Sequence, residues 1–211
     1  MPTNPTNYPI EPAGSALQHI GIFLFNGVEE LDAVGPWDVL SYWTQRYPED
    51  GWRVSCVSQD GSQVVAAKGL VLGAHHSISD ASELAVLIHP GGMGTRRLLR
   101  DNEHLNWVRE QRVRVPLMAS VCTGSLVYAA AGLLADRPAT THWASLDLLA
   151  GLEPSAIIDT DARYVDDGDL LTSAGVSAGI DMALHLVARL ASSERAEEVR
   201  REIQYDPQPL V

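Results

Sequence analysis

Short apolar runs alternate with longer segments of helical spacing along this 211-residue chain, and that order constrains its fold more than any other feature. Residues 19–25 (HIGIFLF), 84–90 (LAVLIHP) and 115–121 (VPLMASV) have the composition of buried strands. A segment with helical spacing follows each of these strands, and the segment after the second strand spans residues 95–112. Because buried strands joined by helices form parallel sheets, the sequence predicts a doubly wound α/β fold, with a mostly parallel sheet and helices on both faces.

Other segments complete this pattern. Residues 34–47 have helical spacing, with Pro36 tolerated only near the first turn of the helix. Residues 52–60 alternate as in a strand, residues 63–74 read as a strand pair, and residues 156–175 read as a hairpin. We therefore expect a flexible N-terminal arm over residues 1–18 and one α/β domain over the remainder of the chain, 19–211.

The bulk composition excludes several classes of protein. The formal net charge of −12 predicts no binding to nucleic acid or to anionic membranes. Two cysteines, Cys56 and Cys122, are too few for a secreted disulfide framework, and the N-terminus lacks a signal-peptide pattern. No apolar segment reaches the length of a membrane span. We expect a cytoplasmic protein.

Three of the predicted strands are followed by residues that can carry chemistry. The first is followed by EELD, ending at Asp32, the second by PGGMG over 90–94, and the third by CTGS, starting at Cys122. Ligands of open α/β sheets bind at the carboxyl ends of the strands. If these strands are neighbours, an acid, a set of free backbone amides and a thiol meet in one pocket.

Cys122 lies at the corner between a strand and a helix. It is either a small core residue or a nucleophile whose sulfur the corner presents. A helix N-terminus stabilises a thiolate, so the second interpretation predicts a cysteine pKa below about 8.5. Cys56 lies inside an alternating strand and is expected in the core.

The residues after the first two strands also have two interpretations each. Asp32, like Glu29 and Glu30, can cap the following helix, or it can be a buried carboxyl with a raised pKa. Gly91 and Gly92 can form an ordinary turn, or they can present free amides that stabilise negative charge.

Thr123 can simply start a helix or offer its hydroxyl to a substrate or water. His142 is the histidine placed best to support the site, whereas His75, His76 and His104 lie on polar segments and are expected to be solvated. No cluster has metal-ligand spacing, and the glycine-rich turns lack the nucleotide-binding motifs. The sequence therefore predicts no metal and no cofactor.

These motifs together resemble the ThiJ/PfpI superfamily of class-I-amidotransferase-like proteins. The blocks LDAVGPWDVL, SVCTGSLVYAAAGLL, ATTHWA and AGIDMAL, within residues 19–207, look most like those of isocyanide hydratases. They are also similar to the sensor domains of AraC-type regulators. The resemblance implies a flavodoxin-like sheet and a homodimer. It also implies a nucleophile at Cys122 and a hydrogen-bonding acid at Asp32.

Further positions match the same pattern. Gly91 and Gly92 correspond to the backbone turn that faces the cysteine, and Thr123 to the residue after it. The peptidase-like branch has a histidine at the position of Thr123, which argues against peptidase activity. AraC-type regulators continue for roughly a hundred residues of DNA-binding helices, so a chain ending at Val211 is not expected to be one.

The resemblance implies hydration of an organic isocyanide to an N-substituted formamide through a thioimidate on Cys122, with Asp32 as the proton donor. Two alternatives stay open. One is a cofactor-independent glyoxalase-like enzyme for small aldehydes, and the other is a cysteine-based sensor without turnover. Trp37, Trp43 and Trp143 either line the pocket or lie in the core or a dimer interface. The glycine-containing segment 172–181 is either mobile or tightly packed.

Overall fold

A seven-stranded sheet forms the centre of the protein, in the order β10-β11-β7-β6-β1-β2-β5. The computed structural model describes residues 17–81 and 83–207. The strands of the sheet are β1 (Gln18–Leu24), β2 (Trp52–Ser58), β5 (His76–Ser77), β6 (Val86–His89), β7 (Leu117–Val121), β10 (Tyr164–Asp166) and β11 (Leu170–Ser173). All neighbouring strands pair in parallel except β10, which is antiparallel to β11. The predicted α/β fold with a mostly parallel sheet is confirmed.

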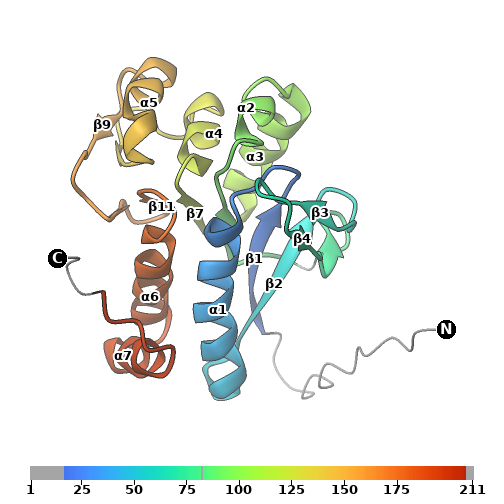
Figure 1. The fold of residues 1–211 in the computed structure, drawn as a ribbon, viewed down its shortest axis with the longest axis vertical. Coiled ribbons are helices and arrows are strands. Elements are labelled where there is room, and N and C mark those ends of the chain that lie inside the picture. The colour runs from blue at the N-terminus through green and yellow to red at the C-terminus, as the bar shows by residue number, and fades with distance from the viewer. Residues whose placement is uncertain (1–16, 82, 208–211) are drawn as a thin grey trace.

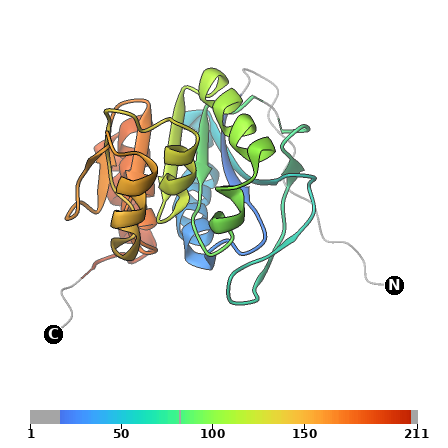
Figure 2. The same cartoon turned by 90° about the horizontal axis from the view of Figure 1, so that it is seen from above.

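Helices cover both faces of this sheet (Figures 1 and 2). On one face α1 packs against α6 and α7, and on the other α3 and α5 both pack against α4. The helices are α1 (Glu30–Arg46), α2 (Thr95–Leu98), α3 (Asn102–Arg114), α4 (Gly124–Ala130), α5 (Leu146–Leu152), α6 (Ala178–Leu190) and α7 (Ser193–Glu202). Short 3-10 turns cover Pro48–Asp50 and Trp143–Ser145.

The three central strands carry the core. Every residue of β6 and β7 is buried, as is β1 after its first residue. Ile22 pairs with Ile88, which pairs in turn with Ala119, so apolar side chains lie in register across the sheet. Burying an Ile or Leu side chain contributes about 1.5–3 kcal/mol. This covered sheet holds the ends of β1, β6 and β7 in fixed relative positions.

Two predicted strand pairs are present outside the central strands. β3 (Val64–Val65) and β4 (Val71–Leu72) form an antiparallel pair around Lys68. β10 and β11 form the predicted hairpin, whose turn contains Gly168 with a φ of 79°. β8 (Pro138–Ala139) and β9 (Ile157–Ile158) add a small parallel pair beside the main sheet.

Three details differ from the sequence-based expectations. α1 begins at Glu30, so Pro36 lies in its second turn rather than its first. The helical pattern over residues 95–112 forms two helices rather than one. Asp101 separates them, because its side chain accepts two backbone N–H bonds and caps the start of α3. The edge strand β5 was not predicted, and it leaves His76 half-buried rather than solvated.

The N-terminal arm predicted over residues 1–18 falls mostly outside the described residues, and Gln18 already belongs to β1. Within residues 17–81 and 83–207, none of the helices combines the length and apolar character needed to cross a membrane.

Candidate active site

The ends of β1, β6 and β7 come together because these three strands are adjacent in the sheet. Parallel strands place their carboxyl ends at one edge, the upper edge in Figure 1, where α1 begins. The residues that follow these strands include Asp32, Gly91 and Cys122. Asp32 accepts a hydrogen bond from Gly91 and interacts with the Cys122 thiol. The sequence-predicted acid, turn and cysteine therefore form one site.

Cys122 occupies a strained corner between β7 and α4, with a φ of 56°. Its N–H lies 3.1 Å from the Ser173 carbonyl oxygen and 3.2 Å from that of Ala174. Its own carbonyl accepts hydrogen bonds from the hydroxyls of Thr141, at 2.9 Å, and Ser125, at 3.1 Å. A positive φ in a residue with a side chain persists only where surrounding contacts hold it, as these do. The corner fixes the direction in which the sulfur points.

Asp32 lies in the first turn of α1 and its side chain has no exposure to solvent. Its Oδ2 accepts the Gly91 N–H at 2.9 Å, while its Oδ1 receives no bond from a nitrogen or oxygen donor of the described residues. Burial raises the pKa of Asp32 to about 7, and the nearby Glu29 charge adds to that rise. Hydrogen bonds from Gly91 and Cys122 oppose it. Asp32 can therefore gain or lose a proton near neutral pH.

The pKa of Cys122 is raised rather than lowered, so the expectation of a helix-stabilised thiolate is wrong. Burial and the neighbouring Asp32 carboxylate raise it to about 12. Backbone N–H groups of Val176 and Thr123 hydrogen-bond to the sulfur and oppose this rise. They do not outweigh it, because the side chain is only 5% exposed. At neutral pH the pair formed by Cys122 and Asp32 shares its protons as one unit.

Gly91 of the PGG turn packs too closely on Asp32 and Thr123 for any residue but glycine. A Cβ on Gly91 would lie 2.5 Å from the Thr123 nitrogen and 2.9 Å from Asp32 Oδ2. Gly92 has a φ of 118° and donates its N–H to Thr123 Oγ1 at 2.9 Å. The Gly91 N–H is bonded to Asp32, as described above. The expectation of free amides is therefore wrong: both amides hold protein groups in place.

Thr123 is buried and its hydroxyl lies within the protein rather than toward a ligand. Besides the Gly92 amide, Thr123 Oγ1 is 3.3 Å from Thr95 Oγ1, and Thr95 Oγ1 also donates to the Gly92 carbonyl at 2.7 Å. The hydroxyl of Thr123 thus ties the PGG turn to the start of α4. Its backbone N–H is the part that contacts the Cys122 sulfur.

His142 contacts the loops around the site rather than the pair of Cys122 and Asp32. Its Nδ1 accepts the Ala144 N–H at 3.1 Å, which caps the following 3-10 turn. Its ring packs on Gly175, where an added Cβ would lie 2.4 Å from Cδ2. His142 therefore supports the loop next to the cysteine corner.

Val176 was not singled out from the sequence, although its N–H contacts the Cys122 sulfur. Its φ is 48°, which is unfavourable for a β-branched residue. The close packing of Gly175 on His142 and of Gly179 on Val121 holds this segment. Residues 172–181 are thus a tightly packed element that aims one amide at the nucleophile. In the sequence, the glycines of this segment were the only indication of its tight packing.

A buried histidine pair lies directly before the PGG turn. His89 Nδ1 donates to the Pro90 carbonyl at 2.8 Å, so the neutral ring must accept at Nε2 from the His104 Nε2–H at 3.0 Å. Burial lowers the pKa of His89 to about 3 and that of His104 to about 4, so both are neutral at pH 7. The expectation that His104 is solvated is wrong, because its ring stacks on Phe23.

The profile of the DJ-1/PfpI family matches residues 18–189. The chain belongs to this family. Isonitrile hydratase from Pseudomonas putida is 41% identical to it over 194 residues, which cover 92% of this chain and 81% of that enzyme. The transcriptional regulator GbdR of Pseudomonas aeruginosa is 28% identical over 180 residues, and those cover 85% of this chain and 48% of the regulator.

Solved structures of the family have the same fold. A ThiJ/PfpI family protein from Pseudomonas syringae superposes with a TM-score of 0.80 and 30% identity, covering 98% of this chain and 86% of that one. Drosophila melanogaster DJ-1beta superposes with a TM-score of 0.76 at 22% identity, covering 90% of this chain and all of that one, and supports the fold alone.

In this DJ-1/PfpI chain the three tryptophans considered from the sequence have separate environments. Trp43 is fully buried in the core, and Trp37 stacks on His75 at a centroid distance of 5.1 Å. Trp143 is 77% exposed and lies beside His142. Of the three, Trp143 is the exposed one, and it adjoins the loop that contacts the cysteine corner through Thr141.

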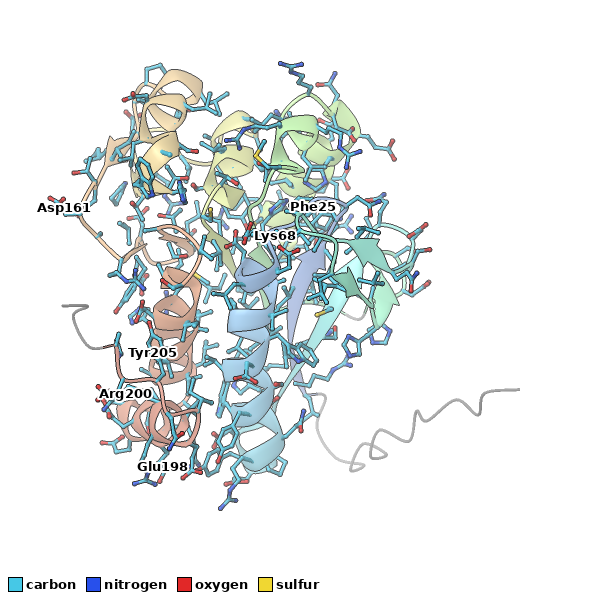
Figure 3. All side chains as sticks on the ribbon, viewed as in Figure 1. Phe25, Lys68, Asp161, Glu198, Arg200 and Tyr205 are labelled. Atoms are coloured by element: carbon cyan, nitrogen blue, oxygen red, sulfur yellow. The ribbon has the colours of Figure 1, made fainter. Side chains whose placement is uncertain are left out.

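Lys68, the single lysine of the chain, holds the β3–β4 hairpin over the first turn of α1 (Figure 3). Its side chain pairs with Glu29 and Glu30, and its N–H donates to Glu30 Oε1 at 2.6 Å. The hairpin therefore covers the turn that carries Asp32.

A surface hollow formed by described residues lies far along the chain from the residues of this site. This hollow of about 460 Å³ lies at α7 and is lined by residues that include Glu198, Arg200 and Tyr205 (Figure 3). It contains no cysteine or histidine. Among the described residues, no three His, Cys, Asp or Glu side chains are grouped as metal ligands.

Proposed function

We propose that this protein is an isocyanide (isonitrile) hydratase, which converts R–NC and water to the formamide R–NH–CHO. The observation that carries the proposal is the buried contact between the Cys122 thiol and the Asp32 carboxyl, whose pKa is about 7. This pair can exchange one proton at neutral pH. Its occurrence in a chain 41% identical to an isonitrile hydratase supports this reaction over other cysteine chemistry.

The first half of the reaction forms a covalent intermediate. The Asp32 carboxylate takes the thiol proton, and the Cys122 sulfur attacks the terminal isocyanide carbon. Asp32 then returns the proton to that carbon, which gives the thioimidate R–N=CH–S–Cys. The Val176 and Thr123 amides stabilise the negative sulfur during attack. This step adds the thiol across the isocyanide and leaves Asp32 as a carboxylate.

The second half hydrolyses that intermediate. Asp32 takes a proton from water while the hydroxide adds to the thioimidate carbon, and this proton passes to the nitrogen. The carbon–sulfur bond then breaks, Asp32 moves the hydroxyl proton to the leaving sulfur, and the formamide departs. The Oδ1 of Asp32, which has no N–H or O–H donor among the described residues, is the atom available to orient this water. Only chain residues and water take part.

We also propose that the protein works as a homodimer. Exposed apolar side chains gather on the α1 turns and on the β3–β4 hairpin, close to the site. They include Leu31, Val34, Leu70 and Val71. A second copy covering them would shield the site from water. Light scattering of the purified protein that gives the mass of one chain would contradict this assignment.

The direct test of the function is to mix the protein with an aryl isocyanide and follow formamide formation by absorbance. We expect turnover by the wild type and by Cys56→Ala, and none by Cys122→Ala. Cys56 is buried within strand β2 and makes no hydrogen bond with Cys122 or Asp32 among the described residues, so it controls for the loss of a buried thiol. No turnover by the wild type, or full turnover by Cys122→Ala, would refute the proposal. If the protein converts methylglyoxal to lactate and does not hydrate the isocyanide, the result supports the aldehyde-enzyme alternative.

A further inference from the structure

A local excess of positive charge lies beside the site of this acidic protein. The segment 91–100 contains Arg96, Arg97 and Arg100 and no acidic residue, although the chain as a whole has a net charge of −12. The segment follows β6, begins with the two glycines of the PGG turn and continues into α2. The overall charge repels anions from most of the surface, so a basic segment at this edge marks a place where an anion can approach.

Arg96 is half-buried and contacts only neutral groups, unlike the half-buried Arg112, Arg137 and Arg195. Its Nη1 donates to Thr95 Oγ1 at 2.9 Å and its Nη2 lies 3.5 Å from Ser145 Oγ. No carboxylate lies within salt-bridge distance of it among the described residues. By contrast, Arg112, Arg137 and Arg195 are each paired with acids. A guanidinium has five N–H donors, and the contacts of Arg96 engage only two groups, both neutral.

The contacts of Arg96 link its guanidinium, through two hydroxyl groups, to the residue that follows the nucleophile. Thr95 Oγ1, which receives the Nη1 bond, is 3.3 Å from Thr123 Oγ1, and Thr123 directly follows Cys122. Ser145 lies on the 3-10 turn that begins after His142. The Arg96 side chain thus bridges α2 and the loop on the other side of the cysteine corner. The exposed side chain of Trp143 comes from that same loop.

We propose that Arg96 binds an anionic group, a carboxylate, on the substituent of the isocyanide substrate. This inference rests on the proposed function. The isocyanide carbon meets Cys122 while the carboxylate forms charge-assisted hydrogen bonds with the unused N–H groups of Arg96. Trp143 offers an apolar surface to the part between them. Arg96 is therefore a specificity-determining residue, and the preferred substrates are isocyano carboxylic acids.

The test compares an isocyanobenzoate with its methyl ester, which share the aryl isocyanide group and differ in charge. We expect the wild type to have a lower KM for the acid than for the ester. Arg96→Gln raises KM for the acid about 10-fold or more, as expected for a lost charge-assisted bond, and leaves the ester unchanged. Arg96→Lys keeps the charge and retains part of the preference. Arg100→Gln is the matched control, because it removes the same charge from an exposed position of the segment.

The outcomes separate this inference from the function on which it rests. Turnover of the ester by the wild type tests hydration alone, whereas the ratio of acid to ester tests Arg96. A wild type without preference for the acid overturns the inference, as does an Arg100→Gln effect equal to that of Arg96→Gln. A fall of kcat on both substrates in Arg96→Gln and Arg96→Lys, with unchanged KM, also overturns it, because it assigns Arg96 to the chemical step. If neither the acid nor the ester is hydrated, the proposed function fails first.

Discussion

The Gly91 N–H donates to Asp32 Oδ2 at 2.9 Å, and this bond joins the end of β6 to the first turn of α1. It fixes one oxygen of a buried carboxyl whose other oxygen has no N–H or O–H donor among the described residues. The carboxyl is thereby oriented toward Cys122 without being locked in its charged form, and its pKa stays near 7. Proton exchange with the thiol depends on this arrangement.

Gly91→Ala tests the arrangement. The added Cβ would lie 2.5 Å from the Thr123 nitrogen and 2.9 Å from Asp32 Oδ2, so the turn must move away from both. We expect a loss of about 1–3 kcal/mol in the free energy of unfolding and a fall of at least about 10-fold in kcat/KM. Urea unfolding and isocyanide turnover measure the two effects.

Gly151→Ala is the control for that change. Gly151 lies in α5, and a Cβ there meets no atom within 4 Å. We expect unchanged activity and a free energy of unfolding equal to or slightly above that of the wild type. Equal activity in Gly91→Ala and Gly151→Ala would show that the close approach of the turn does not matter.

Asp32→Asn is expected to stabilise the fold while it removes activity. The pKa of Asp32 is raised from 3.8 to about 7 in the folded protein, so the wild type loses stability as pH rises from about 4 to about 7. Above pH 7 the folded state holds a buried charge that Asn lacks. Urea unfolding at pH 8 should show a gain of about 2–4 kcal/mol for the variant, and a much smaller gain at pH 4.5. A loss of stability at pH 8 would contradict the raised pKa.

His104→Leu removes the donor to His89. The buried Nε2 of His89 then lacks a partner, which costs about 1–3 kcal/mol at pH 7. The lowered pKa values of both histidines also predict that the wild type loses stability as pH falls below about 6.5, because the unfolded chain binds these protons more tightly. The variant should show a weaker dependence on pH over that range. His104→Gln keeps a hydrogen-bond donor at this position and serves as the control. Equal free energies of unfolding for His104→Leu and His104→Gln would refute the hydrogen bond to His89.

The sequence was sufficient to predict the sheet and the meeting of Asp32, Gly91 and Cys122. Strand-forming runs fix the order of elements, and parallel strands place their carboxyl ends at one edge. The adjacency of β1, β6 and β7 turned that expectation into a site. This prediction depended only on local sequence patterns, namely the strand-forming runs and the residues that directly follow them.

Other features depend on distant contacts that no local pattern records. The pKa of Cys122 depends on the depth of its burial, whereas the sequence shows only the adjacent helix start. His104 is polar on a polar helix, yet Phe23 and His89 bury it from the sheet side. The amide of Val176 reaches Cys122 because of a φ that its side chain disfavours. These contacts could be found only in three dimensions.

The pH dependence of kcat/KM reports the protonation of the pair. The reactive form holds one proton between Asp32 and Cys122. With the pKa of Asp32 at about 7 and that of Cys122 at about 12, kcat/KM should rise through an apparent pKa near 7 and then stay level to at least pH 10. Asp32→Asn should lose the rise together with about 10²–10⁴-fold in activity. A rise centred near 9, retained in Asp32→Asn, would mean that the thiol titrates alone.

The most direct test of the account is to trap the intermediate. Wild-type protein is mixed with excess aryl isocyanide, quenched in acid within milliseconds to seconds, and digested for mass spectrometry. We predict that the peptide containing Cys122 gains the full mass of the isocyanide and that the Cys56 peptide does not. The adduct should persist while formamide forms and disappear once the isocyanide is consumed. Formamide production without any adduct on Cys122 across the time course, or an adduct that never turns over, would contradict nucleophilic catalysis by this cysteine.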